Sequence, residues 1–449
     1  MDWIKFKIKS LAIQKAGNNL GKKTAADFLS QMQVSYDPTA HQILRTLSYI
    51  VSGAADFGEV LVATTKFADN IPFDELIVRW YDVWHELAQK TEKTAEESAA
   101  HGHLCSAASA YLRACEYHRQ SGFFLRENLD DPRGLEAMKG VQKCFRDHIS
   151  KAGLDIQPIE IPFEEENGRG KKFLFGYFAR GAGATSPEEV RTTIIFPGGY
   201  DGCAEESWSS GGAQAVARGY NVILLDGPGQ GATLFFNRMY MRADYDKVLD
   251  ASIAWLARNK AKETSINHLA VLGRSFGGFL GAQMAAKTQI PLLAVALDPL
   301  QVDFAGAEKR FPFPPGALKL FKDKKFDEMD KIWLPALKEM PLVRFQIMSR
   351  AAVHGFSASP SLWLHSIMNE FSCVDDLENI SCPVWTAMGE NEKISMPGVE
   401  ENCAKIKDLT IHRFSQAADG ALGHCQAGAS ARFFEAMYNW MEEKAPARV

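Results

Sequence analysis

The sequence has little that would bind a nucleic acid or anchor the chain in a membrane. Its 449 residues carry a formal net charge of −5, without a long block of lysine and arginine. A surface that binds phosphate groups needs clustered positive charge, so no nucleic-acid partner is expected. No apolar run is long enough to span a bilayer, and Lys5, Lys7 and Lys9 interrupt the first apolar segment. We therefore expect neither a signal peptide nor stable membrane insertion.

Cysteine patterns typical of metal or redox sites are also missing. The eight cysteines are scattered through apolar segments, and none belongs to a Cys-x-x-Cys pair. This excludes the usual structural zinc motifs and predicts reduced, mostly buried thiols in a cytoplasmic protein. We expect neither a metal nor an organic cofactor.

The first third of the chain has a helical pattern. Phe73–Lys90 and Ala95–Phe123 carry apolar residues at helical spacing and contain few glycines or prolines. Asp130-Asp131-Pro132 interrupts this pattern, and a further helix is predicted over Leu135–Ala152. We therefore predict a helical N-terminal region over residues 1–153 that forms a lid.

Beyond this region, short apolar runs alternate with helical stretches. Runs rich in Val, Ile and Leu are typical of strands buried on both faces, and the alternation predicts an α/β fold. Its central sheet would be mostly parallel, with helices on both faces. The predicted strands are Ile156–Phe163, Lys172–Phe178, Thr192–Phe196, Asn221–Leu225, His268–Leu272, Leu292–Leu297, Val384–Met388 and Thr410–Phe414.

One interval is too long to be a simple crossover between strands. It separates Asp298 from Val384 and contains several helical stretches, including Phe326–Glu339 and Leu342–Val353. We predict a helical cap insertion over residues 301–375. The α/β core would then have two parts, residues 154–300 and 376–449, and its ligand would bind at the carboxyl ends of the strands.

The segment Gly273-Arg274-Ser275-Phe276-Gly277 matches the pattern G-x-S-x-G. A predicted buried strand runs directly into it, and a helix is predicted directly after it. Strand, sharp turn and helix are what a nucleophile elbow requires, whereas an ordinary glycine-rich turn is the alternative. Ser275 is the predicted nucleophile.

A glycine-rich loop precedes this motif in the chain, at Pro197-Gly198-Gly199-Tyr200-Asp201. Acyl chemistry at a serine needs two backbone N–H groups to stabilise the oxyanion. We assign one to Phe276, the residue after the nucleophile, and the other to Tyr200 or Gly199. Asp226, in a later D-x-P-G-x-G turn, is expected to have a structural role.

His424 lies after the last predicted strand and before a C-terminal helix. A triad on this fold has its histidine in that loop, so His424 is the predicted base. For the acidic residue that would orient His424, the sequence leaves three candidates. Glu392 occupies the position of the usual Asp in G-x-x-D-x-x-x-P, whereas Asp298 and Glu390 are alternatives.

These motifs resemble those of the α/β-hydrolases related to 2,6-dihydroxypseudooxynicotine hydrolase and of the fungal polyketide-shortening hydrolases of pigment synthesis. The resemblance rests on the Ala-rich Ser106–Phe123 stretch, Pro197–Asp201, the Ser275 elbow and Gly423-His424-Cys425-Gln426. It implies an α/β-hydrolase fold whose N-terminal and inserted helices roof the site. It also implies cleavage of a carbon–carbon bond next to a ketone, and it is compatible with a homodimer. The group has Asp where this chain has Glu392.

Three functions remain open from the sequence. A serine hydrolase could cleave a C–C bond in a bulky, hydrophobic, polyketide-like or aryl-ketone substrate. The same triad could serve an ester or lactone hydrolase, an acyltransferase or a cyclase. A hydrolase-like protein that binds a small molecule without turnover is the alternative from another class.

Overall fold

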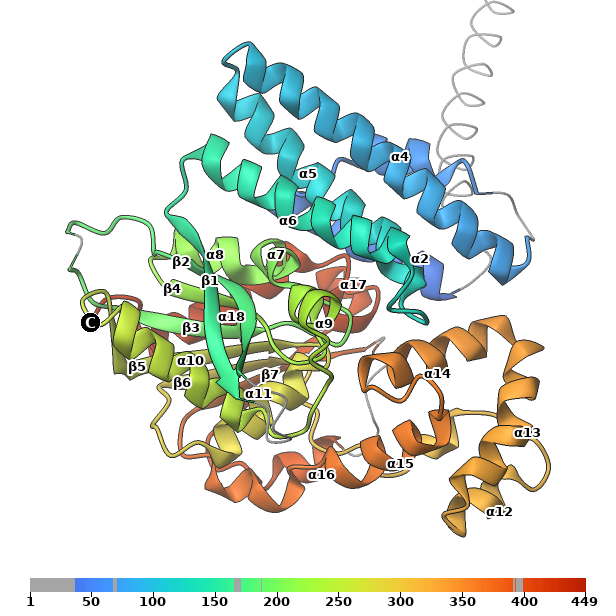
Figure 1. The fold of residues 1–449 in the computed structure, drawn as a ribbon. Coiled ribbons are helices and arrows are strands. Elements are labelled where there is room, and N and C mark those ends of the chain that lie inside the picture. The colour runs from blue at the N-terminus through green and yellow to red at the C-terminus, as the bar shows by residue number, and fades with distance from the viewer. Residues whose placement is uncertain (1–36, 68–70, 165–170, 187, 391, 393–398) are drawn as a thin grey trace, which may run out of the picture.

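The computed structural model describes residues 37–67, 71–164, 171–186, 188–390, 392 and 399–449, which Figure 1 colours along the chain. Helices of the N-terminal part lie above a twisted sheet, and the helices of residues 317–370 lie beside it. The segment around Lys5–Lys9 and residues 165–170, between the first two predicted strands, lie outside the described residues.

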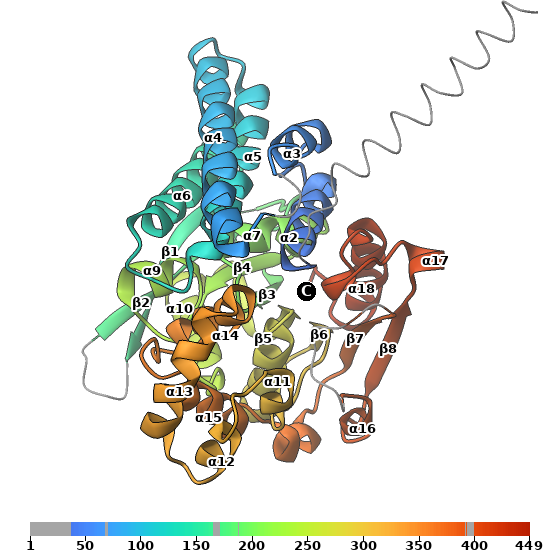
Figure 2. The same cartoon turned by 90° about the vertical axis from the view of Figure 1, so that its right-hand side faces the viewer.

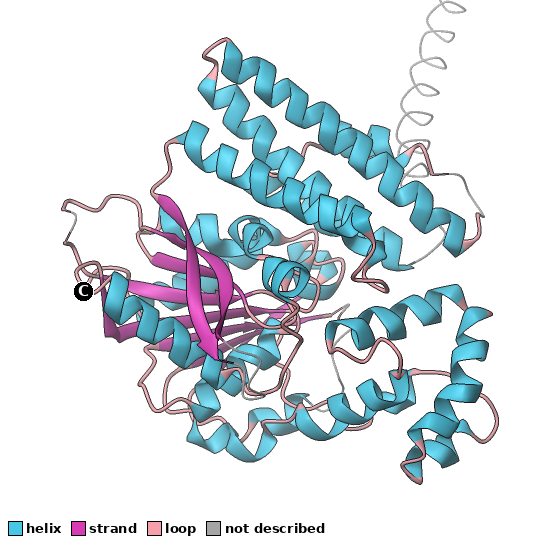
Figure 3. Cartoon of the chain, in the orientation of Figure 1, coloured by secondary structure: helices cyan, strands magenta, loops and turns pink. Residues whose placement is uncertain are grey.

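Eight strands of the described residues form one sheet, in the order β1-β2-β4-β3-β5-β6-β7-β8. The pairs β1–β2 and β2–β4 are antiparallel, and every other neighbouring pair is parallel. The mostly parallel sheet flanked by helices is therefore confirmed (Figure 3). The strands are β1 (Ile156–Glu164), β2 (Lys171–Ala179), β3 (Arg191–Pro197), β4 (Asn221–Asp226), β5 (Thr264–Arg274), β6 (Ala294–Asp298), β7 (Val384–Gly389) and β8 (Leu409–Phe414).

Both faces of the sheet are buried, because alternate side chains of the central strands enter two different cores. Ile195 of β3 and Val271 of β5 pack into the core that contains helices α10 and α11. Ile194 and Leu272 enter the opposite core, with the C-terminal helix α18. The helices between and after the strands are α7 (Ala204–Ser207), α8 (Ala213–Ala217), α9 (Gly231–Asn237), α10 (Asp246–Asn259), α11 (Gly277–Lys287), α16 (Val399–Cys403), α17 (Gln416–Asp419) and α18 (Ser430–Lys444), with the π-helical turn η3 (Trp208–Gly212) and the 3₁₀ turns η5 (Val374–Asn379) and η6 (His424–Gln426).

The N-terminal region is helical, as the sequence predicts, but one predicted helix is wrong in its extent. The single helix expected over Ala95–Phe123 is divided at His101-Gly102-His103. Gly102 takes a positive φ of +77°, which ends the preceding helix and allows the next to return antiparallel. The elements are α2 (Asp37–Ser48), η1 (Tyr49–Ser52), α3 (Phe57–Thr64), α4 (Phe73–Ala100), α5 (Leu104–Gly122), η2 (Phe123–Leu125) and α6 (Pro132–Ala152).

The insertion after β6 is also helical, and it meets the N-terminal helices. Arg344 on α14 pairs with Asp74 on α4 at 2.6 Å and with Glu127 at 3.0 Å. The Phe345 ring packs against Phe124 with ring centres 4.9 Å apart. Figure 2 shows α14 below the end of α4. The elements of the insertion are η4 (Ala307–Arg310), α12 (Ala317–Lys322), α13 (Phe326–Lys338), α14 (Pro341–Val353) and α15 (Pro360–Glu370).

The described helices include none with the length and apolarity that crossing a membrane demands. All eight cysteines lie among the described residues as free thiols, and six of them are buried.

Candidate active site

Ser275 lies in a sharp turn between β5 and α11. Its φ of +57° is a left-handed conformation that non-glycine residues seldom adopt. Neighbouring glycines make the turn sterically feasible, because a Cβ on Gly273 would lie 2.0 Å from the Gly277 carbonyl oxygen. A Cβ on Gly278 would lie 1.9 Å from the carbonyl oxygen of Pro299. The turn has the strained strand–turn–helix geometry of a nucleophile elbow.

Ser275, His424 and Glu392 form a hydrogen-bonded chain. Nε2 of His424 lies 2.7 Å from Oγ of Ser275, and its Nδ1 lies 2.7 Å from Oε2 of Glu392. The His424 and Glu392 side chains are only 7% and 14% exposed. His424 comes from the loop after β8, whereas Glu392 follows β7. In this arrangement an imidazole can accept the serine proton while the carboxylate orients the ring.

The surroundings of His424 favour its charged form. Burial lowers the pKa of the imidazole, but the adjacent Cys425 and Glu392 side chains outweigh burial and raise the pKa of His424 well above its ordinary value. The ring centre of His41, on α2, lies 6.1 Å from that of His424. Burial and the charges of His424 and Arg45 lower the pKa of His41 to about 4, so this second imidazole is neutral at neutral pH.

The two other acidic residues considered as partners of His424 are engaged elsewhere. Asp298 accepts hydrogen bonds from Nε of Arg274 and Nε2 of Gln426, both at 2.9 Å. Glu390 is exposed and accepts from the backbone N–H of Gln416. Of the three candidates, Glu392 is the one whose carboxylate reaches His424.

The buried pair of Arg274 and Asp298 connects the serine turn to the histidine loop. Arg274 also donates to the carbonyl oxygen of Cys425, while the carbonyl oxygen of Asp298 accepts the backbone N–H of Ser275 at 2.7 Å. Sequence reasoning missed this pair as a structural unit. The available signal was Arg274 itself, a charged side chain at the end of an apolar strand.

The loop after β3 approaches the serine closely. A Cβ on Gly199 would lie 3.0 Å from Cβ of Ser275 and 3.1 Å from the Arg274 carbonyl oxygen. Nε2 of Gln230 donates to the carbonyl oxygens of Gly198 and Gly199, at 2.6 and 3.0 Å. Because a trans peptide directs its N–H opposite to its C=O, these bonds fix the N–H groups of Gly199 and Tyr200.

The N-terminal region holds the same loop from its other side. Arg126, which follows η2, donates to the carbonyl oxygen of Tyr200 at 3.0 Å and to the carboxylate of Asp201. Its side chain is 8% exposed. Sequence reasoning missed Arg126 and His41, because neither lies in a motif, and it missed Gln230, because this residue occupies a variable position of the D-x-P-G-x-G turn. Asp226 has the structural role expected of it, since its carboxylate accepts the backbone N–H groups of Ala204 and Ala232.

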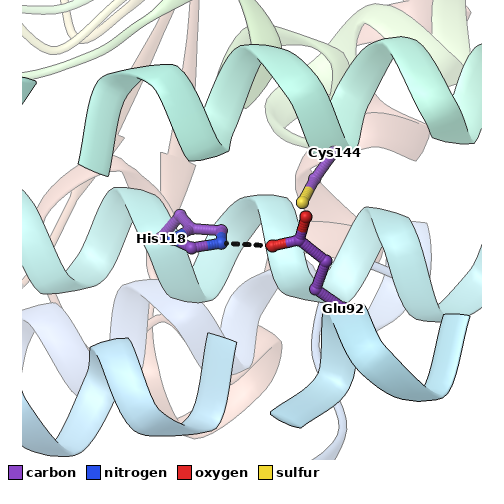
Figure 4. Close-up of side chains that lie close together, drawn as sticks. All are labelled: Glu92, His118 and Cys144. Atoms are coloured by element: carbon purple, nitrogen blue, oxygen red, sulfur yellow. Dashed lines mark hydrogen bonds and ion pairs between the residues drawn. The ribbon is translucent and has the colours of Figure 1, made fainter. Parts of the chain in front are cut away.

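One group of described residues, on α4, α5 and α6, has side-chain atoms arranged so that they could hold a metal ion (Figure 4). These are Glu92, His118 and Cys144, whose ligand atoms lie within 4.8 Å of one another. Nε2 of His118 bonds Glu92 at 3.0 Å, and Lys143 donates to the other Glu92 oxygen at 2.6 Å. Because the lysine already compensates the carboxylate charge, we assign this group to helix packing.

Comparison with known proteins places the site within a matched segment. Residues 194–428 match the profile of the alpha/beta hydrolase family. The hydrolase acrC of Aspergillus aculeatus is 32% identical over 258 residues, which are 56% of this chain and 59% of that protein. The 20-hydroxy-prefusarin hydrolase FUS2 of Gibberella moniliformis is 30% identical over 60% of this chain and 62% of its own length. The matches to these two relatives thus cover about three fifths of each.

A longer match and a solved structure extend the similarity. The hydrolase ORFZ of Pyricularia oryzae is 27% identical over 82% of this chain and 85% of its own length. The crystal structure of 2,6-dihydroxy-pseudo-oxynicotine hydrolase superimposes with a TM-score of 0.67 at 18% identity, covering 90% of this chain and 97% of that one. At this identity the structural match shows a shared fold.

Proposed function

Because the chain belongs to the alpha/beta hydrolase family, we propose that it is a serine hydrolase with Ser275 as nucleophile, His424 as general base and Glu392 as acid. The observation that carries the proposal is the Ser275–His424–Glu392 chain of 2.7 Å contacts. The elbow conformation of Ser275 and the burial of the other two side chains support it. Backbone strain of this kind clusters at functional sites.

In the proposed reaction, Oγ of Ser275 attacks a substrate carbonyl carbon and passes its proton to Nε2 of His424. The backbone N–H of Phe276 and that of Tyr200 or Gly199 stabilise the oxyanion. When the tetrahedral intermediate collapses, the leaving group departs with the electron pair of the broken bond and takes the proton from His424. Water then attacks the acyl-enzyme, again with His424 as base, and releases a carboxylic acid and Ser275.

We further propose that the broken bond is a C–C bond next to a ketone, in a bulky polyketide-like or aryl-ketone substrate. The resemblance of the motifs to polyketide-shortening hydrolases supports this reaction. The name of FUS2, a hydrolase of 20-hydroxy-prefusarin, agrees with a bulky substrate. An ester has the same acyl half, so the leaving group must be tested directly.

The first experiment tests the nucleophile. The protein is treated with a fluorophosphonate, and intact mass and peptide mapping are measured for the wild type, His424→Ala and a control, His412→Ala. We expect one adduct on Ser275 that is lost in His424→Ala and retained in the control. A folded wild type that forms no adduct on Ser275 would contradict the proposed nucleophile.

The second experiment tests the reaction. A β-diketone and an ester that share one acyl group are incubated with the wild type and with Ser275→Ala, with and without an alcohol acceptor. We expect the wild type to release the shared acid from the β-diketone faster than from the ester. Faster ester cleavage would indicate an esterase, and acyl transfer to the alcohol would indicate an acyltransferase.

A further inference from the structure

Three buried polar atoms without hydrogen-bond partners lie between the loop after β3 and the cap helices. They are the hydroxyl of Tyr200, the indole Nε1 of Trp363 and Nε2 of His354. Trp363 lies on α15, and His354 directly follows α14. A buried polar atom without a partner costs free energy, so such a group calls for an explanation.

The other two atoms belong to side chains that lie next to Tyr200. The His354 ring stacks on the Tyr200 ring, with centres 5.6 Å apart and planes 29° apart. The Trp363 indole lies near the Tyr200 hydroxyl; burial outweighs it and the Arg350 charge and raises the pKa of Tyr200 well above its ordinary value, so the phenol keeps its proton and can donate it in a hydrogen bond. On another side, the Phe276 ring lies 4.7 Å from that of Tyr200. Because Phe276 directly follows Ser275, the group is adjacent to the proposed nucleophile.

A positive charge completes this group. The guanidinium carbon of Arg350, on α14, lies 5.7 Å from the centre of the Tyr200 ring. Arg350 donates to the Gln346 carbonyl oxygen at 2.6 Å, and among the described residues no carboxylate lies within ion-pair distance of it. Arginine and tryptophan side chains can only donate hydrogen bonds, and a tyrosine hydroxyl donates readily. The set therefore suits an acceptor, above all one with a negative charge.

We propose that Tyr200, Trp363 and Arg350 form a subsite that binds an anionic oxygen of the substrate, either the enolate oxygen of a 1,3-dicarbonyl or a carboxylate. His354 supports the Tyr200 ring by stacking on it. The inference rests on the proposed function for the position of the substrate. In a C–C cleavage the electron pair of the broken bond moves onto the carbonyl oxygen beyond the leaving carbon, and the subsite would stabilise that enolate until His424 returns the proton.

Binding to a variant that cannot turn over tests the subsite separately from catalysis. Ser275→Ala is titrated by calorimetry with three probes, above the pKa of the diketone. The probes are benzoylacetone as its enolate, 4-phenylbutyrate as a carboxylate and 4-phenyl-2-butanone as a neutral ketone. Tyr200→Phe and Trp363→Phe are then added singly to Ser275→Ala. Trp255→Phe, on α10, serves as the matched control, since Trp255 packs against Phe178 and not against Tyr200.

We expect each subsite variant to weaken binding of an anionic probe by ~10-fold or more, because each loses a hydrogen bond to a charged group. Binding of the neutral ketone and all binding by the Trp255 control should stay within about twofold of the parent. If only the binding of benzoylacetone is weakened, the subsite binds an enolate oxygen. If only the binding of 4-phenylbutyrate is weakened, it binds a carboxylate. The subsite is overturned if Tyr200→Phe and Trp363→Phe leave the affinity for both anions unchanged, or if they weaken binding of the neutral ketone equally. It is also overturned if the Ser275→Ala parent binds neither anion. Fluorophosphonate labelling of Ser275 reports on the nucleophile independently.

Discussion

At the scale of single residues, the choice of Glu392 as the acid depends on whether its longer side chain can still bond His424. A glutamate has one methylene more than the usual aspartate, and here its carboxylate still lies 2.7 Å from Nδ1 of His424. The backbone N–H of Glu392 donates to the Gly389 carbonyl oxygen at 3.1 Å, which sets the turn after β7. The turn thus accommodates the longer side chain.

Neutralising this carboxylate should lower activity and change its pH dependence. Glu392 helps to raise the pKa of His424, and the base works only when neutral, so activity is lost as the pH falls through that pKa. We expect Glu392→Gln to lower kcat by ~10³-fold or more. The acidic limb of kcat/KM should move to lower pH, as measured by pH–rate profiles. Glu390→Gln is the control. If the acidic limb of the kcat/KM profile does not move in Glu392→Gln, Glu392 is not the acid.

A stability measurement distinguishes the role of Asp298 from that of Glu392. Asp298→Ala leaves the Arg274 guanidinium buried without its partner, so we expect a loss of about 3–5 kcal/mol in the free energy of unfolding. Glu392→Gln should change the free energy of unfolding by less, because the amide oxygen can still accept from His424. Urea unfolding of both variants checks this, and equal losses would contradict the division of roles.

At the scale of elements, the sequence is informative where local pattern and burial coincide. The strand predicted at Asn221–Leu225 ends within one residue of β4, because a strand buried on both faces is continuously apolar. The predicted turn at Ser275 likewise depends on adjacent glycines. By contrast, the helix break at Gly102 was missed because the flanking residues continue a helical pattern. The contacts of Arg126 and Arg274 were missed because they join segments far apart in the chain.

The loop after β3 offers a test of one such long-range contact. Arg126 fixes the Tyr200 carbonyl oxygen, so its loss should disorder the proposed oxyanion donors and leave the triad intact. We expect Arg126→Ala to lower kcat by ~10–100-fold, which is less than the loss of an oxyanion donor itself. Steady-state kinetics measures this effect. Arg133→Ala is the matched control, because Arg133 pairs locally with Asp131. Equal kinetics in the two variants would contradict a positioning role.

At the scale of the whole molecule, buried ion pairs attach the N-terminal helices to the α/β core. Glu206 on α7 accepts hydrogen bonds from Arg45 at 2.6 Å and from Tyr49, and it lies 3.7 Å from Arg119. Its side chain is 4% exposed. Burial opposes ionisation, yet Arg119 and Arg45 outweigh it and lower the pKa of Glu206 to about 2. The two parts should therefore unfold as one cooperative unit.

This network should contribute stability that depends on pH. Because the folded pKa of Glu206 is depressed, its contribution is complete above the ordinary pKa of a glutamate and is lost as the pH falls toward 2. We expect Glu206→Gln to cost about 3–5 kcal/mol at pH 7, with a smaller difference from wild type near pH 3. Urea unfolding at both pH values measures it. A cost that does not depend on pH would contradict the ionic role, and Glu75→Gln, in an exposed pair with Arg79, is the control.

The position of His424 late in the chain has a consequence for the growing polypeptide. A ribosome completes α2, the helical roof and the Ser275 turn before it adds β7, β8 and the loop of His424. Until then the partly made chain carries the proposed nucleophile without its proposed base and acid. The order of synthesis should therefore keep the proposed triad incomplete, and the nascent chain without hydrolase activity, until residues 384–424 have been made.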